Sequence, residues 1–191
     1  MTTIGVLALQ GDFAEHLGVL RKLDVDVQQV RLPSELTGID GLIIPGGEST
    51  TMGQLMDLYG LREPIKNRIQ EGMAVWGTCA GLILLADRLE DDRPEPLRLL
   101  DIDVTRNAFG RQVDSFEVDL EVPAFQGRAF HAIFIRAPII RQLRNGVQTL
   151  ASLSDGRVVA VRQGNMLGTS FHPELTEDVR FHQYFLSMVV S

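Results

Sequence analysis

The chain contains one cysteine, Cys79, in the stretch Gly77-Thr78-Cys79-Ala80-Gly81 between an apolar run and a helical pattern. A sharp turn from a strand into a helix, bordered by small residues, can raise a nucleophile at its apex, as the Gly-x-Ser-x-Gly turn does for serine. The start of a helix also favours a thiolate, because its free N–H groups and dipole attract negative charge. A core cysteine packed among Val75, Trp76 and Leu82 fits the same residues, so this motif alone leaves both interpretations open.

A thiolate nucleophile needs a general base and a group that orients the base. Both residue types occur near residue 172, where a late apolar run ends in His172-Pro173-Glu174. Residues two apart in an extended segment point the same way, so the Glu174 carboxylate can reach the His172 imidazole. A surface histidine beside a helix-capping glutamate is the alternative. The remaining histidines lie within helical or strand patterns, and we expect structural roles for them: His16, His131 and His182.

The third segment suited to such a reaction is Pro45-Gly46-Gly47-Glu48-Ser49-Thr50, which follows an apolar run. A Gly-Gly turn exposes backbone N–H groups, which can stabilise the oxyanion of an acyl-transfer intermediate. We expect the amides of Gly47 and Ala80 to be the two donors. Ser49 and Thr50 fit the N-terminal cap of the following helix equally well. A phosphate-binding P-loop is excluded, because no Gly-Lys-Ser/Thr follows the glycines.

The elements that must position these segments follow from the hydrophobic pattern. Apolar runs bounded by Gly, Pro or Asp predict strands at residues 4–9, 27–32, 41–44, 74–76, 99–104, 115–122, 129–135, 158–162 and 166–171. Helical periodicity predicts helices at residues 13–23, 50–58, 62–70, 80–89 and 177–190, the first of them capped by Asp12. Several strands are apolar throughout, which indicates strands covered on both faces.

Strands and helices alternate in the first half of the chain, which is typical of an α/β doubly wound fold. We therefore expect a mixed, mostly parallel sheet flanked by helices. Residues 111–135 carry strand signals without a helix between them, and this predicts a small antiparallel excursion. The polar segment 90–96 is short and the strand pattern resumes after it, so residues 1–191 are expected to form a single domain.

Composition narrows the range of partners. The formal net charge is −7 and no cluster of Lys and Arg is present, which argues against a nucleic-acid partner. One cysteine and four scattered histidines offer no thiolate cluster for zinc, and a lone thiol fits a reducing compartment. No secretory signal pattern opens the chain, and no apolar run reaches the roughly 18 residues that span a bilayer. We expect a cytoplasmic protein without a metal ion and without membrane contact.

All three segments follow predicted strands, and open α/β sheets place their sites at the carboxyl ends of strands. Taken together, they predict a cysteine-dependent acyl-transfer enzyme. Their order and spacing resemble the triad-type (class I) glutamine amidotransferases. Three further segments look like the glutaminase subunits of two-component pyridoxal 5′-phosphate (vitamin B6) synthases: residues 9–16 (LQGDFAEH), 106–112 (RNAFGRQ) and 134–138 (FIRAP). This similarity covers nearly the whole chain, although Arg98 stands where the family tends to have glycine.

The resemblance implies a class I glutamine amidotransferase-like, flavodoxin-like fold and the hydrolysis of L-glutamine to glutamate and ammonia. It also implies a partner, a separate synthase (lyase) subunit that makes pyridoxal 5′-phosphate from ammonia, a pentose 5-phosphate and glyceraldehyde 3-phosphate. Pyridoxal 5′-phosphate is then the product of the complex, so no cofactor is expected. Two alternatives remain open: a glutaminase subunit of another amidotransferase pathway, and a non-enzymatic thiol-sensing module of the same fold.

Residue roles carry over from the family position by position. Cys79 is the expected nucleophile, which forms a γ-glutamyl thioester, His172 is the base, and Glu174 orients the base. Gln10 is expected to steady the Gly46-Gly47 turn and to meet the partner. The residues expected to contact glutamine are Gly47, Glu48, Ser49, Arg106, Ile135 and Arg136. Without the resemblance, an arginine in an acidic protein is more readily explained as a member of a surface ion pair.

Overall fold

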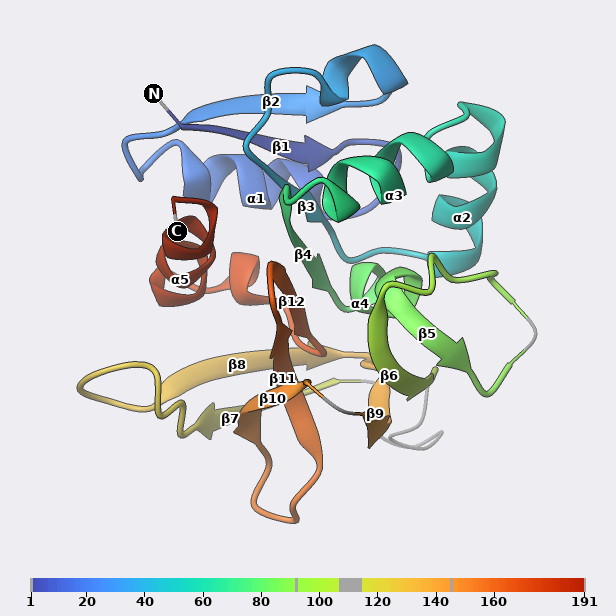
Figure 1. Ribbon diagram of the computed structural model, residues 1–191. Helices are drawn as coiled ribbons and strands as arrows, with labels where there is room; N and C mark the ends of the chain where they lie inside the picture. The colour runs from blue at the N-terminus through green and yellow to red at the C-terminus, as the bar shows by residue number, and fades with distance from the viewer. Residues whose placement is uncertain (1, 92, 107–114, 145, 191) are drawn as a thin grey trace.

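The computed structural model describes residues 2–91, 93–106, 115–144 and 146–190. Its central sheet has seven strands in the order β10-β11-β12-β4-β3-β1-β2 (Figure 1). Five neighbouring strands run parallel, namely β12 (Met166–Thr169), β4 (Ala74–Thr78), β3 (Gly41–Ile44), β1 (Thr3–Leu7) and β2 (Asp26–Val30). The other two, β11 (Val158–Gln163) and β10 (Gln148–Ser152), add an antiparallel edge. The expected mixed, mostly parallel sheet is confirmed.

Helices cover both faces of this sheet (Figure 1). On one face, α1 (Phe13–Leu20) and α5 (Arg180–Val189) contribute Leu17, Leu20, Phe181 and Phe185 to a core that includes Trp76 of β4. On the other face, α2 (Ser49–Leu58), α3 (Arg62–Gln70) and α4 (Ala80–Leu85) contribute Met52, Met56, Ile65, Ile69 and Leu82 to a second core. Because β3 and β4 lie between the two cores, they are buried along their whole length. The doubly wound arrangement is confirmed.

Two smaller sheets and two short helices complete the described chain. The hairpin of β7 (Ser115–Leu120) and β8 (Phe130–Ile135) is antiparallel, as expected for this part of the chain, while residues 111–114 lie outside the described residues. A three-stranded sheet joins β5 (Ala86–Leu89), β6 (Leu100–Thr105) and β9 (Ile139–Leu143). The 3₁₀ helices are η1 (Pro33–Leu36) and η2 (Pro173–Leu175).

The helix predicted at residues 80–89 is wrong in its second half. It ends at Leu85, and the following residues form β5, which pairs with β6. Three backbone N–H groups of the later segment 97–99 donate to the carbonyls of Leu84, Leu85 and Ala86, so the free carbonyls at the end of α4 find donors outside the helix. The strands β9 and β10 carry weak patterns and were not predicted.

The remaining boundaries shift by only a few residues. Helix α1 ends at Leu20, three residues earlier than predicted, and α5 begins at Arg180 instead of 177. In the described part of the chain, no helix combines the length and the apolar character that crossing a membrane requires.

Candidate active site

The three segments that are expected to carry the catalytic residues meet at one edge of the central sheet. Strands β12, β4 and β3 are adjacent and parallel, and Thr169 pairs with Thr78 while Ile44 pairs with Gly77 at their carboxyl ends. The chain leaves these strands toward His172, Cys79 and the Gly46-Gly47 turn respectively. Neighbouring parallel strands therefore bring together residues that lie more than 90 positions apart in the sequence.

Cys79 lies at the sharp turn between β4 and α4, with φ 48° and ψ −100°. A positive φ costs a non-glycine residue on the order of 1–3 kcal/mol, so the surrounding structure must hold this conformation. Crowding supplies the constraint, because a Cβ on Gly77 would lie 2.5 Å from the Gly81 backbone and one on Gly81 would lie 1.9 Å from the Ile44 oxygen. Both flanking glycines are required sterically, as their spacing predicted. Cys79 is only 7% exposed, but it lines a cavity instead of being enclosed in the core.

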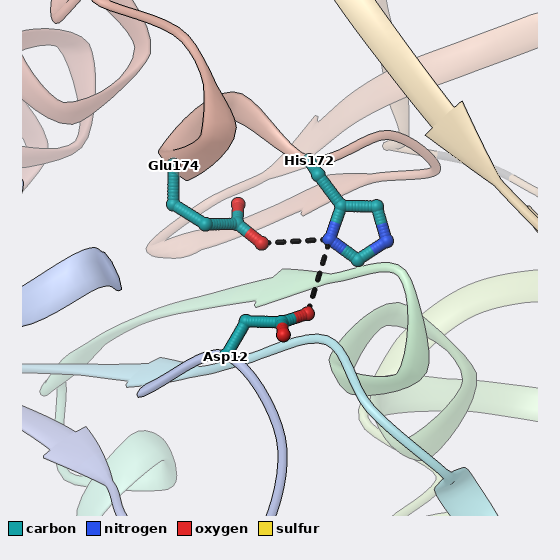
Figure 2. A group of neighbouring side chains, drawn as sticks. All are labelled: Asp12, His172 and Glu174. Atoms are coloured by element: carbon teal, nitrogen blue, oxygen red, sulfur yellow. Dashed lines mark hydrogen bonds and ion pairs between the residues drawn. The ribbon is translucent and has the colours of Figure 1, made fainter. Parts of the chain in front are cut away.

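His172 and Glu174 form a hydrogen-bonded pair (Figure 2). His172 Nδ1 lies 2.7 Å from Glu174 Oε1, and both side chains are buried. The η2 helix begins at Pro173, directly after the histidine, and thus fixes the backbone between the two residues. A Cβ on Gly46 would lie 2.4 Å from His172 Cε1, so the Gly-Gly turn closes over the imidazole.

Asp12 is the second carboxylate at this imidazole, its Oδ2 3.4 Å from His172 Nδ1 (Figure 2). The prediction that Asp12 caps α1 is wrong in its chemistry: the residue occupies the cap position, but its side chain makes no capping hydrogen bond. Its backbone N–H donates to the Gly46 oxygen at 3.0 Å, which directs the carboxylate toward His172. Asp12 therefore belongs to the site, a role that sequence reasoning missed.

The electrostatics of the cluster favour a protonated imidazole. Burial alone would lower the pKa of His172, but hydrogen bonds to Asp12, Cys79 and Glu174 outweigh it and raise this pKa to about 12. The hydrogen bond to His172 lowers the pKa of Asp12, whereas burial raises the pKa of Glu174. At neutral pH His172 is therefore a cation between two carboxyl groups and the cysteine sulfur.

A cavity of about 470 Å³ opens in front of this cluster. Such a volume lies within the range of small-molecule sites, roughly 300–1,000 Å³. Every residue expected to contact glutamine lines it, together with the catalytic candidates Cys79 and His172. Three lining residues were not predicted, namely Asp12, Ile83 and Leu175.

The side chain of Gln10 holds the Gly46-Gly47 turn in place. Gln10 Oε1 accepts a hydrogen bond from the Glu48 N–H at 2.8 Å, and a Cβ on Gly47 would lie 2.5 Å from the same oxygen. Gly47 has φ 148° and lines the cavity. Ala80, the other expected oxyanion donor, is the first residue of α4 directly after Cys79, and its side chain is buried outside the cavity lining.

Glu48, not Ser49 or Thr50, is the N-terminal cap of α2. Its carboxylate accepts hydrogen bonds from the N–H groups of Thr50 and Thr51 at 3.1 and 2.7 Å, which corrects the capping role considered for the two hydroxyl residues. The Ser49 and Thr50 hydroxyls instead contact Arg106 Nη1 at 3.3 and 3.0 Å. Glu48 combines a structural role with its place in the cavity wall.

Two arginines give the cavity positive charge. Arg106 is anchored by the two hydroxyls and by an ion pair with Asp91 at 3.2 Å. Arg136 is exposed at the cavity wall and has φ 44°. Guanidinium groups in this position suit a ligand that carries a carboxylate.

One group of side chains among the described residues is close enough to share a metal ion, and it consists of Asp12, His172 and Glu174. Each offers one ligand atom, and these three atoms all lie within 4.8 Å of one another. The imidazole nitrogen of this group already faces both carboxylates in hydrogen bonds or ion pairs. These interactions account for the cluster without an ion.

Comparisons with known proteins identify the family of this chain. The model of the SNO glutamine amidotransferase family matches residues 6–191. The pyridoxal 5′-phosphate synthase subunit PdxT of Roseiflexus castenholzii is 55% identical over 97% of this chain and 100% of its own length, and that of Herpetosiphon aurantiacus is 57% identical over the same shares. A solved structure of a glutamine amidotransferase superposes with a TM-score of 0.93 at 50% identity, covering 98% of this chain and 99% of that one. The chain belongs to the SNO glutamine amidotransferase family.

Proposed function

We propose that this chain is the glutaminase subunit of a pyridoxal 5′-phosphate synthase and hydrolyses L-glutamine to glutamate and ammonia. The observation that carries the proposal is the convergence of Cys79, the His172–Glu174 pair and the Gly46-Gly47 turn on one cavity. Full-length relatives named pyridoxal 5′-phosphate synthase subunits, at 55–57% identity, support the choice of pathway.

In the first half-reaction, the Cys79 thiolate, beside the protonated His172, attacks the carbon of the side-chain amide of glutamine. The amide oxygen becomes an oxyanion, which the N–H groups of Gly47 and Ala80 stabilise. His172 then donates its proton to the nitrogen as the carbon–nitrogen bond breaks, and ammonia leaves a γ-glutamyl thioester on the cysteine. The protonated state of His172 that the cluster favours suits this acid step.

In the second half-reaction, water adds to the thioester carbon. Neutral His172, which has given its proton to ammonia, accepts a proton from the water, and Glu174 holds the ring in the orientation that both steps need. The carbon–sulfur bond breaks, glutamate is released, and the proton returns the cluster to its starting state. These steps use no metal or organic cofactor.

Glutamine must be held by its charged end so that its side-chain amide reaches Cys79. In our proposal Arg106 and Arg136 face the α-carboxylate, and Gly47, Glu48, Ser49 and Ile135 form the remaining contacts. The Glu48 carboxylate is the natural partner of the α-ammonium group, since capping of α2 already keeps it ionised: burial opposes the charge, but hydrogen bonds from Thr51 and Thr50 lower the pKa of Glu48.

The ammonia passes to a separate lyase subunit, which builds pyridoxal 5′-phosphate from a pentose 5-phosphate and glyceraldehyde 3-phosphate. Gln10 connects this partner with the Gly46-Gly47 turn, because its side chain accepts the hydrogen bond from the Glu48 N–H, next to Gly47. A partner that contacts Gln10 can thereby adjust the turn over His172.

The test is an assay of glutamate release from glutamine, with and without the synthase subunit, in wild-type protein and in Cys79→Ala. We expect activity that rises when the synthase subunit is added and that disappears in the variant. Wild-type activity in Cys79→Ala would overturn the nucleophile assignment. Stimulation by an amidotransferase partner of another pathway, and not by the synthase, would favour the first alternative. Absence of any thioester with glutamine would favour the thiol-sensing module.

A further inference from the structure

Three buried side chains lie behind Glu174, on the side away from His172. These are His16 of α1, Thr78 at the end of β4 and His182 of α5, all with 0% exposure. His16 Nε2 lies 3.2 Å from Thr78 Oγ1 and 3.3 Å from Glu174 Oε2. Its other nitrogen, Nδ1, lies 3.0 Å from His182 Nε2. A continuous row of polar groups therefore runs from the interior to the carboxylate that orients the base.

The charge state of the two histidines follows from their burial. Burial lowers the pKa of His16 well below its ordinary value, and it lowers the pKa of His182 to about 3. Both rings are therefore neutral at pH 7, and each carries a single N–H group. Which nitrogen carries it depends on the neighbours.

Burial raises the pKa of Glu174, but the ion pair with the protonated His172 at 2.7 Å favours its ionised form, and a carboxylate in this form decides the direction of the hydrogen bonds. Because a carboxylate only accepts, a bare His16 Nε2 at 3.3 Å would place two lone pairs against each other. His16 must therefore carry its proton on Nε2, and its bare Nδ1 must accept a hydrogen bond from His182 Nε2–H. The last nitrogen, His182 Nδ1, is then bare, and it is buried without a hydrogen-bond partner among the described residues. A bare nitrogen there costs less than a buried N–H without an acceptor.

The two oxygens of Glu174 have different surroundings. Oε1 is bonded to His172, whereas Oε2 is buried and has no well-aligned hydrogen-bond donor in the described part of the chain. The His16 N–H points more directly at Thr78, but His16 Nε2 also lies 3.3 Å from Oε2, so this N–H helps to offset the charge on the oxygen. Trp76 fixes both rings, edge-on to His16 and His182 at centroid distances of 5.6 and 4.9 Å.

We propose that His16 is a positioning residue for glutamine hydrolysis: its Nε2–H supports Glu174 Oε2, and His182 fixes the His16 tautomer by donating to Nδ1. This inference rests on the proposed function, because Glu174 acts only through the base that it orients. Without the His16 N–H, the carboxylate gains freedom to rotate, and protonation of Glu174 at the oxygen facing away from His172 becomes easier. Loss of this support should lower kcat and leave KM unchanged, since none of His16, Glu174 and His182 lines the cavity.

The test compares His16→Phe, His16→Gln and His182→Phe with His131→Phe, a matched change at an exposed histidine, all assayed with the synthase subunit. We expect His16→Phe to lower kcat about tenfold with KM within about twofold, in line with lost orientation of a catalytic group. The acid limb of the pH–rate profile of this variant should move to higher pH, because Glu174 loses the His16 N–H while its charged neighbours His172 and Asp12 remain. His16→Gln should recover part of the rate, because its amide N–H can donate, and His131→Phe should change nothing.

Imidazole nitrogen NMR of wild-type protein labelled at histidine gives a readout that does not depend on activity. We expect the Nε2–H tautomer for His16 and a shift toward the other tautomer in His182→Phe. An Nδ1–H tautomer in the wild type would overturn the inference, as would wild-type kcat and pH dependence in a folded His16→Phe protein. If His16→Phe does not fold, the wild-type tautomer and His182→Phe decide the question. A wild-type protein that releases no glutamate would contradict the proposed function, while the tautomer would still test the hydrogen-bond direction.

Discussion

Two histidines in this molecule each lie between two carboxylates, but only one of them has the surroundings of a catalytic residue. His172 faces Glu174 at 2.7 Å and Asp12 at 3.4 Å, and His131 on β8 faces Asp119 at 2.8 Å and Glu117 at 2.9 Å on β7. The side chain of His172 is 5% exposed and that of His131 is 51% exposed. The same arrangement of one histidine and two carboxylates thus occurs in very different environments.

Burial and the neighbouring sulfur make the difference. The pKa of His131 is raised, first by the hydrogen bond to Asp119 and then by that to Glu117, but water and salt screen this pair at the surface. His172 is shielded from water and adjoins Cys79 and a cavity, so its proton can be delivered to a bound molecule. A carboxylate–histidine pair therefore indicates catalysis only when a nucleophile and an enclosed space accompany it.

The most severe test of this contrast removes each imidazole in turn. We expect His172→Ala to lower glutamate release by about a thousandfold or more, the usual cost of losing a triad base. His131→Ala should stay within about twofold of the wild type, because an exposed pair contributes little. Steady-state assays of both variants with the synthase subunit measure the difference. Equal losses in the two variants would show that burial does not separate them.

The two carboxylates at His172 can be ranked in the same way. Glu174→Gln should lower kcat about a hundredfold, since it removes the charge that orients and stabilises the buried imidazolium. Asp12→Asn should cost roughly tenfold, because its contact is longer and partly exposed to solvent. Assays of kcat at a fixed saturating glutamine concentration give the ranking, and Glu117→Gln at the exposed pair is the matched control. A larger loss in Asp12→Asn than in Glu174→Gln would make Asp12 the main partner of the base.

The buried histidines also predict an acid limit on stability. His16 and His182 have folded-state pKa values below the ordinary 6.5, so the unfolded chain binds protons that the folded chain does not as the pH falls below 6.5. Their contribution to stability is complete above that pH and is lost below it, at about 1.4 kcal/mol per pH unit for each histidine. The free energy of unfolding, measured with denaturant between pH 6.5 and 5, should therefore depend less steeply on pH in His182→Phe. The slope should be smaller by the uptake of up to one proton. His131→Phe should keep the wild-type slope, and an unchanged slope in His182→Phe would contradict the burial argument.

Backbone strain offers the smallest expected effect. Cys79 and Arg136 adopt positive φ at the cavity, but Arg98, with φ 58°, is an exposed residue outside the cavity lining. Arg98→Gly should raise the free energy of unfolding by about 0.5 kcal/mol, because relief of strain slightly exceeds the entropy cost of glycine. Chemical denaturation measures the gain, and glutaminase activity should not change. A loss of stability would show that the Arg98 side chain makes a contribution larger than the strain.

The triad segments were predictable because each consists of neighbouring residues at the end of one strand. Gly77-x-Cys79-x-Gly81 and His172-Pro173-Glu174 carry their geometry in the local sequence, and the strand order then brings them together. Asp12 and His16 were assigned to capping and to structure because their partners, His172 and Glu174, lie more than 150 residues away. Their spacing of four residues, which places both on one side of α1, was the signal that was available.

The secondary structure shows the same limit. The pattern of residues 80–89 is helical throughout, and α4 ends at Leu85 only because segment 97–99 bonds its last carbonyls and β6 offers a pairing edge. Such tertiary contacts override local propensity, and the sequence near Leu85 contains no glycine or proline that would signal them.

The central claim is that Cys79 attacks a glutamine side chain with help from His172, and covalent labelling tests it most directly. The wild type, Cys79→Ala, His172→Ala and His131→Ala should each be treated, in complex with the synthase subunit, with a glutamine analogue whose side chain ends in an electrophilic diazoketone. Intact-protein mass spectrometry should show a single adduct, mapped to Cys79, that forms at wild-type rate in His131→Ala, far more slowly in His172→Ala, and not in Cys79→Ala. An adduct on another residue, or equal rates in the two histidine variants, would contradict the account.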